Sequence, residues 1–147
     1  MVTVDPSMLA LQTPPDDWRD LMRHSAALLE RHQLITPTYI DAVLAGLERN
    51  GAYMLIAPGV LLAHARPEEG ALGTGLSLLT TTEDVALMDD PSMPIRLFFT
   101  LAANDSQEHL ALLATLAETL MDSGLMNELR ESEDPVRVAQ ILTPSES

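Results

Sequence analysis

Two nearly uninterrupted apolar stretches, at residues 60–65 and 95–103, constrain the fold of this 147-residue chain more than any other feature. Neither stretch alternates between polar and apolar residues, as a strand with one face in water would. Apolar runs of this kind are typical of strands in the middle of a sheet whose two faces are both covered. We therefore expect a central sheet with a layer of helices on each side.

Other segments predict further strands. Residues 53–57 and 75–82 have the composition of strands, and a short strand is expected around Met1 to Val4 in an N-terminal lead-in. Pro58-Gly59 favours a type II turn, whose backbone does not match the twist of a hairpin. We therefore expect a corner at this turn, and the pairing of the two flanking strands stays open.

Helices are predicted before and after the strands. Asp16 or Asp17 is expected to cap a helix that runs to about His32, and Thr36 caps a second helix that ends at Asn50-Gly51. Three more follow the strands, at about residues 107–121, 124–130 and 134–142. This order predicts an α/β fold, a single domain over residues 1–147 with a mixed sheet of four or five strands flanked by helices on both faces.

The chain has a formal net charge of −14, from 22 acidic and 8 basic residues, and every basic residue is Arg. Such a chain repels nucleic acid and anionic membrane surfaces, so neither is an expected partner. A protein with a basic docking face would be attracted to it. The charge would equally serve as a surface for solubility, and composition leaves both alternatives open.

The composition gives no indication of thiol, membrane or nucleotide chemistry. The chain contains no Cys, and its N-terminus lacks the basic and apolar regions of a signal peptide. No apolar run reaches the roughly 18 residues that a membrane span needs. Gly73 and Gly75 form a GxG without the rest of a Walker pattern. We expect a cytoplasmic protein without a cofactor.

His64 is the first candidate for a catalytic role, because it lies at the end of the first apolar run, just before Arg66-Pro67. A ring at this position is held by a rigid strand and can still be reached from outside. A nucleophilic imidazole needs this geometry. The alternative is a core histidine with its hydrogen bonds satisfied, but the position at a strand end favours function.

His109 is the second candidate. We expect Ser106 to cap the following helix, which makes His109 its third residue and the start of an inward-facing stripe. The positive field of a helix N-terminus favours the neutral ring, and free N–H groups of the first turn would form an anion site. The strand at 95–103 would bring this turn close to His64. Two neutral imidazoles beside an anion site suit phosphoryl transfer.

The remaining polar candidates surround this pair. Arg49 and Arg66 are predicted to contact a phosphoryl group or a partner, as is Ser106, although Arg49 would also suit the C-terminal end of a helix and Arg66 would suit solvent. His24 and His32 are expected to be structural. A zinc site is the competing chemistry, but the histidines lack a short metal-binding spacing and no Cys is present, so no metal is expected.

At these residues the sequence resembles the enzyme IIA components of the bacterial phosphoenolpyruvate-dependent sugar phosphotransferase system, in the mannitol/fructose class. The ascorbate-type subgroup is the nearest. The stretches that carry the resemblance are GAYMLIAPGVLLAHARPEEGALGTGLSLLT, residues 51–80, and MPIRLFFTLAANDSQEHLALLATLAETL, residues 93–120. The resemblance covers about residues 10–143, and it implies a mixed sheet flanked by helices.

The resemblance also implies a function. His64 would take a phosphoryl group from the histidine phosphocarrier protein, which has a basic docking face, and pass it to a cysteine of enzyme IIB. His109 matches the second active-site histidine of the family. The membrane component, enzyme IIC, selects the sugar and would be an indirect partner. The nearest subgroup implies uptake of ascorbate or a related sugar or polyol.

Two other functions remain open. A regulatory module that binds partners according to the phosphorylation state of His64 would use the same histidine. An inert acidic scaffold with buried histidines would not react with a phosphoryl donor. Exposed Leu and Met residues on the terminal helices would permit a homodimer.

Overall fold

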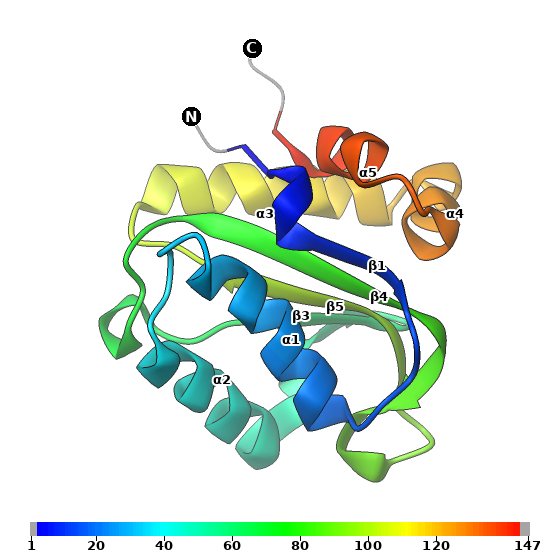
Figure 1. Ribbon diagram of the computed structural model, residues 1–147, viewed down its shortest axis with the longest axis horizontal. Helices are drawn as coiled ribbons and strands as arrows, with labels where there is room; N and C mark the ends of the chain where they lie inside the picture. Colours follow the sequence, from blue (N-terminus) through cyan, green and yellow to red (C-terminus); the bar gives the residue numbers. More distant parts are fainter. Residues whose placement is uncertain (1–2, 145–147) are drawn as a thin grey trace.

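A five-stranded mixed sheet forms the middle layer of the computed structural model, which describes residues 3–144 (Figure 1). The strand order is β1-β4-β5-β3-β2. The β1–β4 and β3–β5 pairs are parallel, and the β4–β5 and β2–β3 pairs are antiparallel. The strands are β1 Leu9–Thr13, β2 Leu55–Ala57, β3 Val60–Ala63, β4 Gly75–Ala86 and β5 Pro94–Ala102. The predicted mixed sheet is therefore confirmed.

Helices cover both faces of this sheet, as predicted. In Figure 1, α1 and α2 lie on one face, and α3, α4 and α5 lie on the other. The helices are α1 Trp18–Glu30, α2 Pro37–Asn50, α3 Ser106–Leu120, α4 Ser123–Glu131 and α5 Pro135–Leu142. None of the helices in residues 3–144 is long and apolar enough to cross a membrane.

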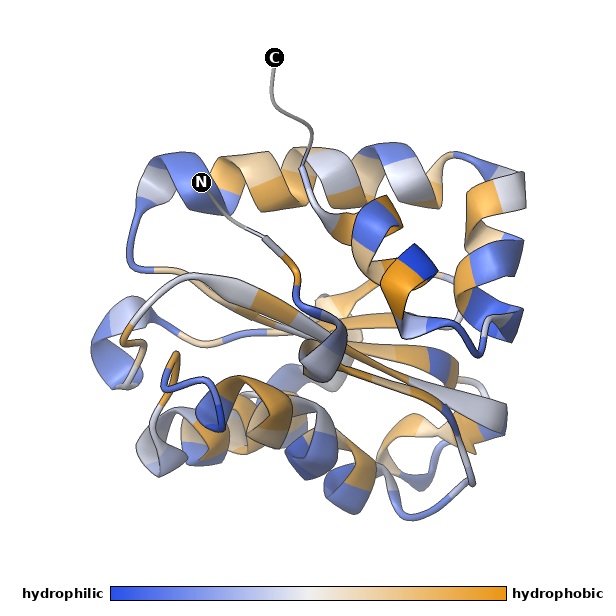
Figure 2. Ribbon diagram, turned by 45° about the horizontal axis from the view of Figure 1, so that its top comes forward, coloured by the Kyte–Doolittle hydropathy of each residue, from blue (hydrophilic) through white to orange (hydrophobic). Residues whose placement is uncertain are grey.

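The alternation of side chains along the two central strands divides the core into two clusters. Leu61, Ala63 and Phe98 pack with α1 and α2, whereas Leu62 and Phe99 pack with the helices on the opposite face. Figure 2 shows the hydrophobic residues concentrated along the strands and on the helix faces turned toward them. Since both faces of β3 and β5 are covered, their sequences have no polar side to present, which explains the apolar runs.

The predicted N-terminal strand is wrong. Met1 and Val2 lie outside the described residues, and Thr3 and Val4 are not in a strand. The first strand instead begins at Leu9, after a single 3-10 turn at Pro6–Met8 that Asp5 caps with its side chain.

The corner expected at Pro58-Gly59 is also absent. The strands β2 and β3 pair directly, with Leu55 opposite Leu61 and Ala57 opposite Val60, and the register shifts between these two pairs. Gly59 has a φ of 77°, which a type II turn requires at its third residue. The pairing, which the sequence left open, is therefore present but short and irregular.

The helix α2 ends at Asn50 with Gly51 as its C-cap, as predicted, and Gly51 keeps a right-handed φ of −57° there. The start of the next strand differs from the prediction. The chain continues as a 3-10 helix at Gly51–Met54, and Tyr53 is therefore not in β2. This turn carries Tyr53 to the surface, where 77% of the residue is exposed.

A buried cluster of hydroxyl groups joins α1 to the sheet. Ser25 donates a hydrogen bond to the carbonyl of Phe98 at 2.8 Å, and its Oγ lies 3.0 Å from the hydroxyl of Thr100. Ser77 donates to the carbonyl of Ser25 at 2.7 Å. All three hydroxyl side chains are fully buried, so their hydrogen bonds compensate for the loss of water.

Replacing Ser25 by Ala should lower the free energy of unfolding by about 1–3 kcal/mol, because it removes hydrogen bonds from buried groups that water cannot reach. Urea unfolding followed by the fluorescence of Trp18, the single and buried Trp, measures this difference. The control is Ser123→Ala at an exposed position in α4, which should change the free energy by less than about 0.5 kcal/mol. Equal stability of Ser25→Ala and the natural protein would contradict the prediction.

Candidate functional site

His64 lies immediately beyond the end of β3, where the chain leaves the sheet. The last paired residue of the strand is Ala63, opposite Thr100 on β5. The Nδ1 atom of His64 lies 3.0 Å from the carbonyl oxygen of Leu62. A carbonyl can only accept, so in the neutral ring Nδ1 carries the proton and Nε2 keeps its lone pair. The ring is half-buried, in agreement with a histidine that a rigid strand holds and that remains accessible.

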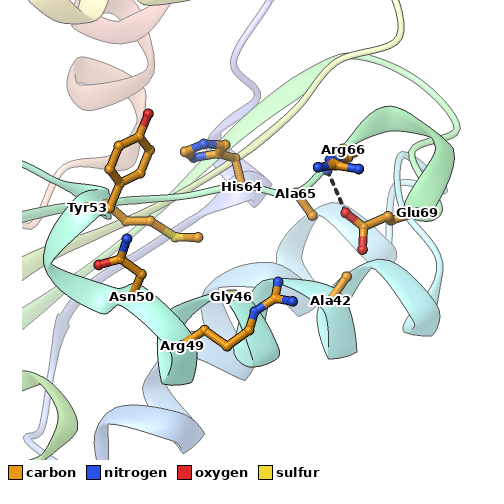
Figure 3. Close-up of a pocket in the computed structure, with 10 residues that line it drawn as sticks. Ala42, Gly46, Arg49, Asn50, Tyr53, His64, Ala65, Arg66 and Glu69 are labelled. Atoms are coloured by element: carbon orange, nitrogen blue, oxygen red, sulfur yellow. Dashed lines mark hydrogen bonds between the residues drawn. The ribbon is translucent and has the colours of Figure 1, made fainter.

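His64 faces an open pocket of about 290 Å³ (Figure 3). The end of α2 contributes Arg49 and Asn50, the following 3-10 turn contributes Tyr53, and the segment after His64 contributes Arg66. Figure 3 shows Arg49 and Arg66 on different sides of the pocket, each from a different element. The pocket therefore brings together two of the predicted cationic residues with the predicted nucleophile.

The charges around this pocket are not all positive. Glu69 also lines it, and its Oε1 accepts a hydrogen bond from the backbone N–H of Arg66 at 3.1 Å. Arg49 and Arg66 are exposed, and neither guanidinium pairs with a carboxylate within the part of the chain that the structure describes. Both remain available to an anion, although the net charge of the chain is −14.

His109 meets His64 at a second, smaller cavity. This cavity of about 50 Å³ is lined by both histidines together with Tyr39 and Leu101. His109 is partly buried and also lines a larger hollow of about 470 Å³, which includes Ser106. The structure thus brings the two predicted histidines together, whereas Ser106 lines only the hollow on the side of His109.

The start of α3 corrects two expectations. Asp105, not Ser106, caps the helix, so His109 is its fourth residue and not its third. The Oδ1 atom of Asp105 accepts the N–H groups of Gln107 at 2.8 Å and Glu108 at 3.1 Å. Two of the N–H groups predicted as an anion site are therefore already bound by a carboxylate, whose charge repels a second anion.

The inward stripe of α3 also differs from the prediction. Its buried residues are Leu112, Leu116 and Thr119. His109, one turn before Leu112 on the helix, is only partly buried. This shift leaves one side of the His109 ring open to the two hollows. An anion near His109 would therefore meet the imidazole itself, not the helix backbone.

Tyr39, a buried residue of α2, also belongs to the site, although the sequence does not single it out. Its hydroxyl accepts the N–H of Ala65 at 3.0 Å and donates toward the carbonyl of Leu101 at 2.8 Å. Burial raises the pKa of Tyr39, the N–H of Ala65 opposes this change, and the charge of Glu69 adds to it. The hydroxyl stays protonated at neutral pH. A Tyr where Phe would fill a core was the available signal, since a buried hydroxyl needs partners.

The other two histidines lie away from the site. His24 is exposed on α1, and the Nε2 atom of His32 is 2.7 Å from the hydroxyl of Ser7. Within residues 3–144 no group of three or more His, Asp or Glu side chains could hold a metal ion.

The loop after His64 is attached to the start of α2. Gly70 has a φ of 128°, and its carbonyl accepts the N–H of Thr36 at 3.0 Å. A Cβ at Gly70 would overlap the hydroxyl of Thr36 and press on Tyr39. The side of the pocket formed by Arg66 and Glu69 is thereby held to the helix that supplies Arg49.

Comparison with known proteins gives one family. Residues 4–144 match the model described as phosphoenolpyruvate-dependent sugar phosphotransferase system, EIIA 2. The mannitol-specific cryptic phosphotransferase enzyme IIA component of Escherichia coli is 33% identical over 127 residues, 86% of each protein. The ascorbate-specific PTS system EIIA component of Shigella dysenteriae is 36% identical over 101 residues, 69% of this chain and 66% of the relative.

Solved structures share the fold. The solution structure of the mannitol-specific cryptic enzyme IIA from Escherichia coli has a TM-score of 0.83 at 30% identity and covers 95% of both chains. The enzyme IIA for mannitol from Escherichia coli, in its complex with phosphorylated enzyme IIB, has a TM-score of 0.81 at 17% identity and covers 97% of this chain and 98% of that one.

Gly70→Ala should lower the free energy of unfolding by about 2 kcal/mol or more, because the new side chain adds a clash to a backbone angle that L residues rarely adopt. Thermal or urea unfolding measures the change. Gly124→Ala, in the first turn of α4, is the control and should change the free energy by less than about 1 kcal/mol, since the helix propensity of Ala offsets a contact at 3.3 Å with the carboxylate of Asp122. A Gly70→Ala variant as stable as the control would refute this account of the loop.

Proposed function

Because the chain belongs to the EIIA 2 family of the phosphoenolpyruvate-dependent sugar phosphotransferase system, and is thus a phosphotransferase of that system, we propose that it carries the phosphoryl group on His64. The observation that supports this role is the 3.0 Å contact between Nδ1 of His64 and the carbonyl of Leu62. It leaves Nε2 unprotonated and directed away from the strand, as a nucleophile must be.

The reaction consists of two transfers. In the first, the Nε2 lone pair attacks the phosphorus of the phosphohistidine on the histidine phosphocarrier protein. The new N–P bond forms on His64 as the N–P bond of the donor breaks, and the donor imidazole keeps that electron pair. In the second, a cysteine thiolate of enzyme IIB attacks the same phosphorus, the Nε2–P bond of His64 breaks as the S–P bond forms, and Nε2 keeps that electron pair, so the ring returns to its neutral Nδ1–H form.

The surrounding side chains suit this chemistry. Arg49 and Arg66 offer guanidinium groups to the phosphoryl oxygens from the pocket. His109 shares the small cavity with His64 and can donate a hydrogen bond to a third oxygen. Ser106 would contact a partner at the adjoining hollow and not the phosphoryl group, since it does not line the pocket of His64.

The proposed partners follow from charge and from the relatives. A net charge of −14 attracts the basic docking face of a histidine phosphocarrier protein. An enzyme IIA of this fold has been solved with phosphorylated enzyme IIB, which supports enzyme IIB as the acceptor. Enzyme IIC would be an indirect partner. The relatives named for ascorbate and for mannitol support ascorbate or a related sugar or polyol as the transported substrate.

Replacing His64 by Ala should abolish phosphorylation when phosphoenolpyruvate, enzyme I and the phosphocarrier protein are supplied. Intact-protein mass spectrometry detects the phosphate as an added mass on the natural protein and none on the variant. His24→Ala, at the exposed histidine of α1, is the control and should be phosphorylated normally. A phosphate that persists on His64→Ala would place the acceptor elsewhere and remove the basis of the proposal.

His109→Ala should keep the fold but slow phosphoryl transfer about 100-fold, the effect of removing one donor that stabilises a developing charge. Rapid-quench measurement of transfer from the phosphocarrier gives the rate, and thermal unfolding checks the fold. His32→Ala, whose ring contacts Ser7 and does not line the pocket of His64, is the control. Transfer at the natural rate in His109→Ala would make His109 a packing residue.

A further inference from the structure

We propose that Tyr39 is a positioning residue for His64, and that its hydroxyl sets the direction of the imidazole by holding the next residues of the chain. The expected effect of Tyr39 on the rate of phosphoryl transfer rests on the proposed function. Its effect on the orientation of the His64 ring does not. Tyr39 belongs to α2, and it is 1% exposed.

The hydroxyl of Tyr39 bridges β3 and β5 where their direct pairing ends. The last residues in register are Ala63 and Thr100. Two residues beyond Ala63, Ala65 donates its N–H to the phenol oxygen at 3.0 Å, and the phenol donates to the carbonyl of Leu101, one residue beyond Thr100, at 2.8 Å. The carbonyl of Ala65 lies 3.2 Å from the same oxygen. A side chain thus replaces main-chain contacts between the two strands.

This bridge is difficult to replace. A phenol has one proton and can accept at the same time, so it serves the donor on Ala65 and the carbonyl of Leu101 together. Both hydrogen bonds to the hydroxyl are buried or partly buried. Without the hydroxyl, an N–H and a carbonyl lose their partner, and the segment after His64 would have to move to find another.

A shift of Ala65 acts directly on the ring of His64, since the two residues are joined by one peptide bond. The ring keeps its tautomer through one contact, from Nδ1 to the carbonyl of Leu62. Tyr39 also lines the small cavity that His64 and His109 share, so its hydroxyl sets the separation of the strand ends that frame this cavity. Displacement of a reacting atom by about 1 Å can reduce a rate about 100-fold.

The test is Tyr39→Phe, which removes the hydroxyl and keeps the ring that packs in the core. The ¹⁵N NMR spectrum of labelled histidine reports the tautomer of His64. In the natural protein we expect the Nδ1–H form, and in the variant a mixture with the Nε2–H form. Single-turnover transfer from the phosphocarrier protein should become about 10-fold to 100-fold slower, with an unchanged Kd for that partner.

The matched control is Ser25→Ala, which also removes buried hydrogen bonds to β5 but touches neither His64 nor Ala65. Ser25→Ala should keep the ¹⁵N histidine spectrum of the natural protein, although it should lose about as much stability as Tyr39→Phe. A natural tautomer in Tyr39→Phe, or the same spectral change in Ser25→Ala, would overturn the inference. If the natural protein accepts no phosphate, the proposed function fails, and the ring spectrum still decides the role of Tyr39.

Discussion

The burial of β3 and β5 on both faces is the constraint on which the rest of the structure depends. These strands are covered by α1 and α2 on one side and by α3 to α5 on the other. A polar side chain on them is therefore accessible to solvent or to a partner only where a strand ends. His64 is the first residue beyond such an end. The start of α3 follows shortly after the end of β5, which is the neighbour of β3, so His109 is brought to the same place.

The apolar runs and the helix caps were readable because they are local in sequence. Asp17, Thr36 and Asp134 each accept a backbone N–H at the start of their helix, and the helices begin where these residues indicated. The strand at Val60–Ala63 is also predictable from its own residues, because all of them are apolar and none suits a face exposed to water. The N-terminal strand was misplaced because an edge strand such as β1 depends on pairing with β4, about seventy residues further along the chain.

The site was predictable in its histidines and not in its hydrogen bonds. His64 and His109 stand out in the sequence. Asp105 and Ser106 are neighbours that both suit a helix cap, and only the backbone conformation shows which of them caps α3. The choice of cap changes what the helix start can bind, because the carboxylate of Asp105 satisfies two of the N–H groups that an anion would have used. The role of Tyr39 was hidden for the same reason, since its partners Ala65 and Leu101 lie 26 and 62 residues away.

Glu69 gives the pocket a property that a permanent binding site would avoid. Its carboxylate lines the same space as Arg49 and Arg66, and it is kept there by the N–H of Arg66. A phosphorylated ring would experience attraction from two guanidinium groups and repulsion from one carboxylate, so the anion would rest in a shallow energy well. If His64 carries the phosphoryl group as proposed, a short residence time would serve its transfer to the next protein better than tight retention would.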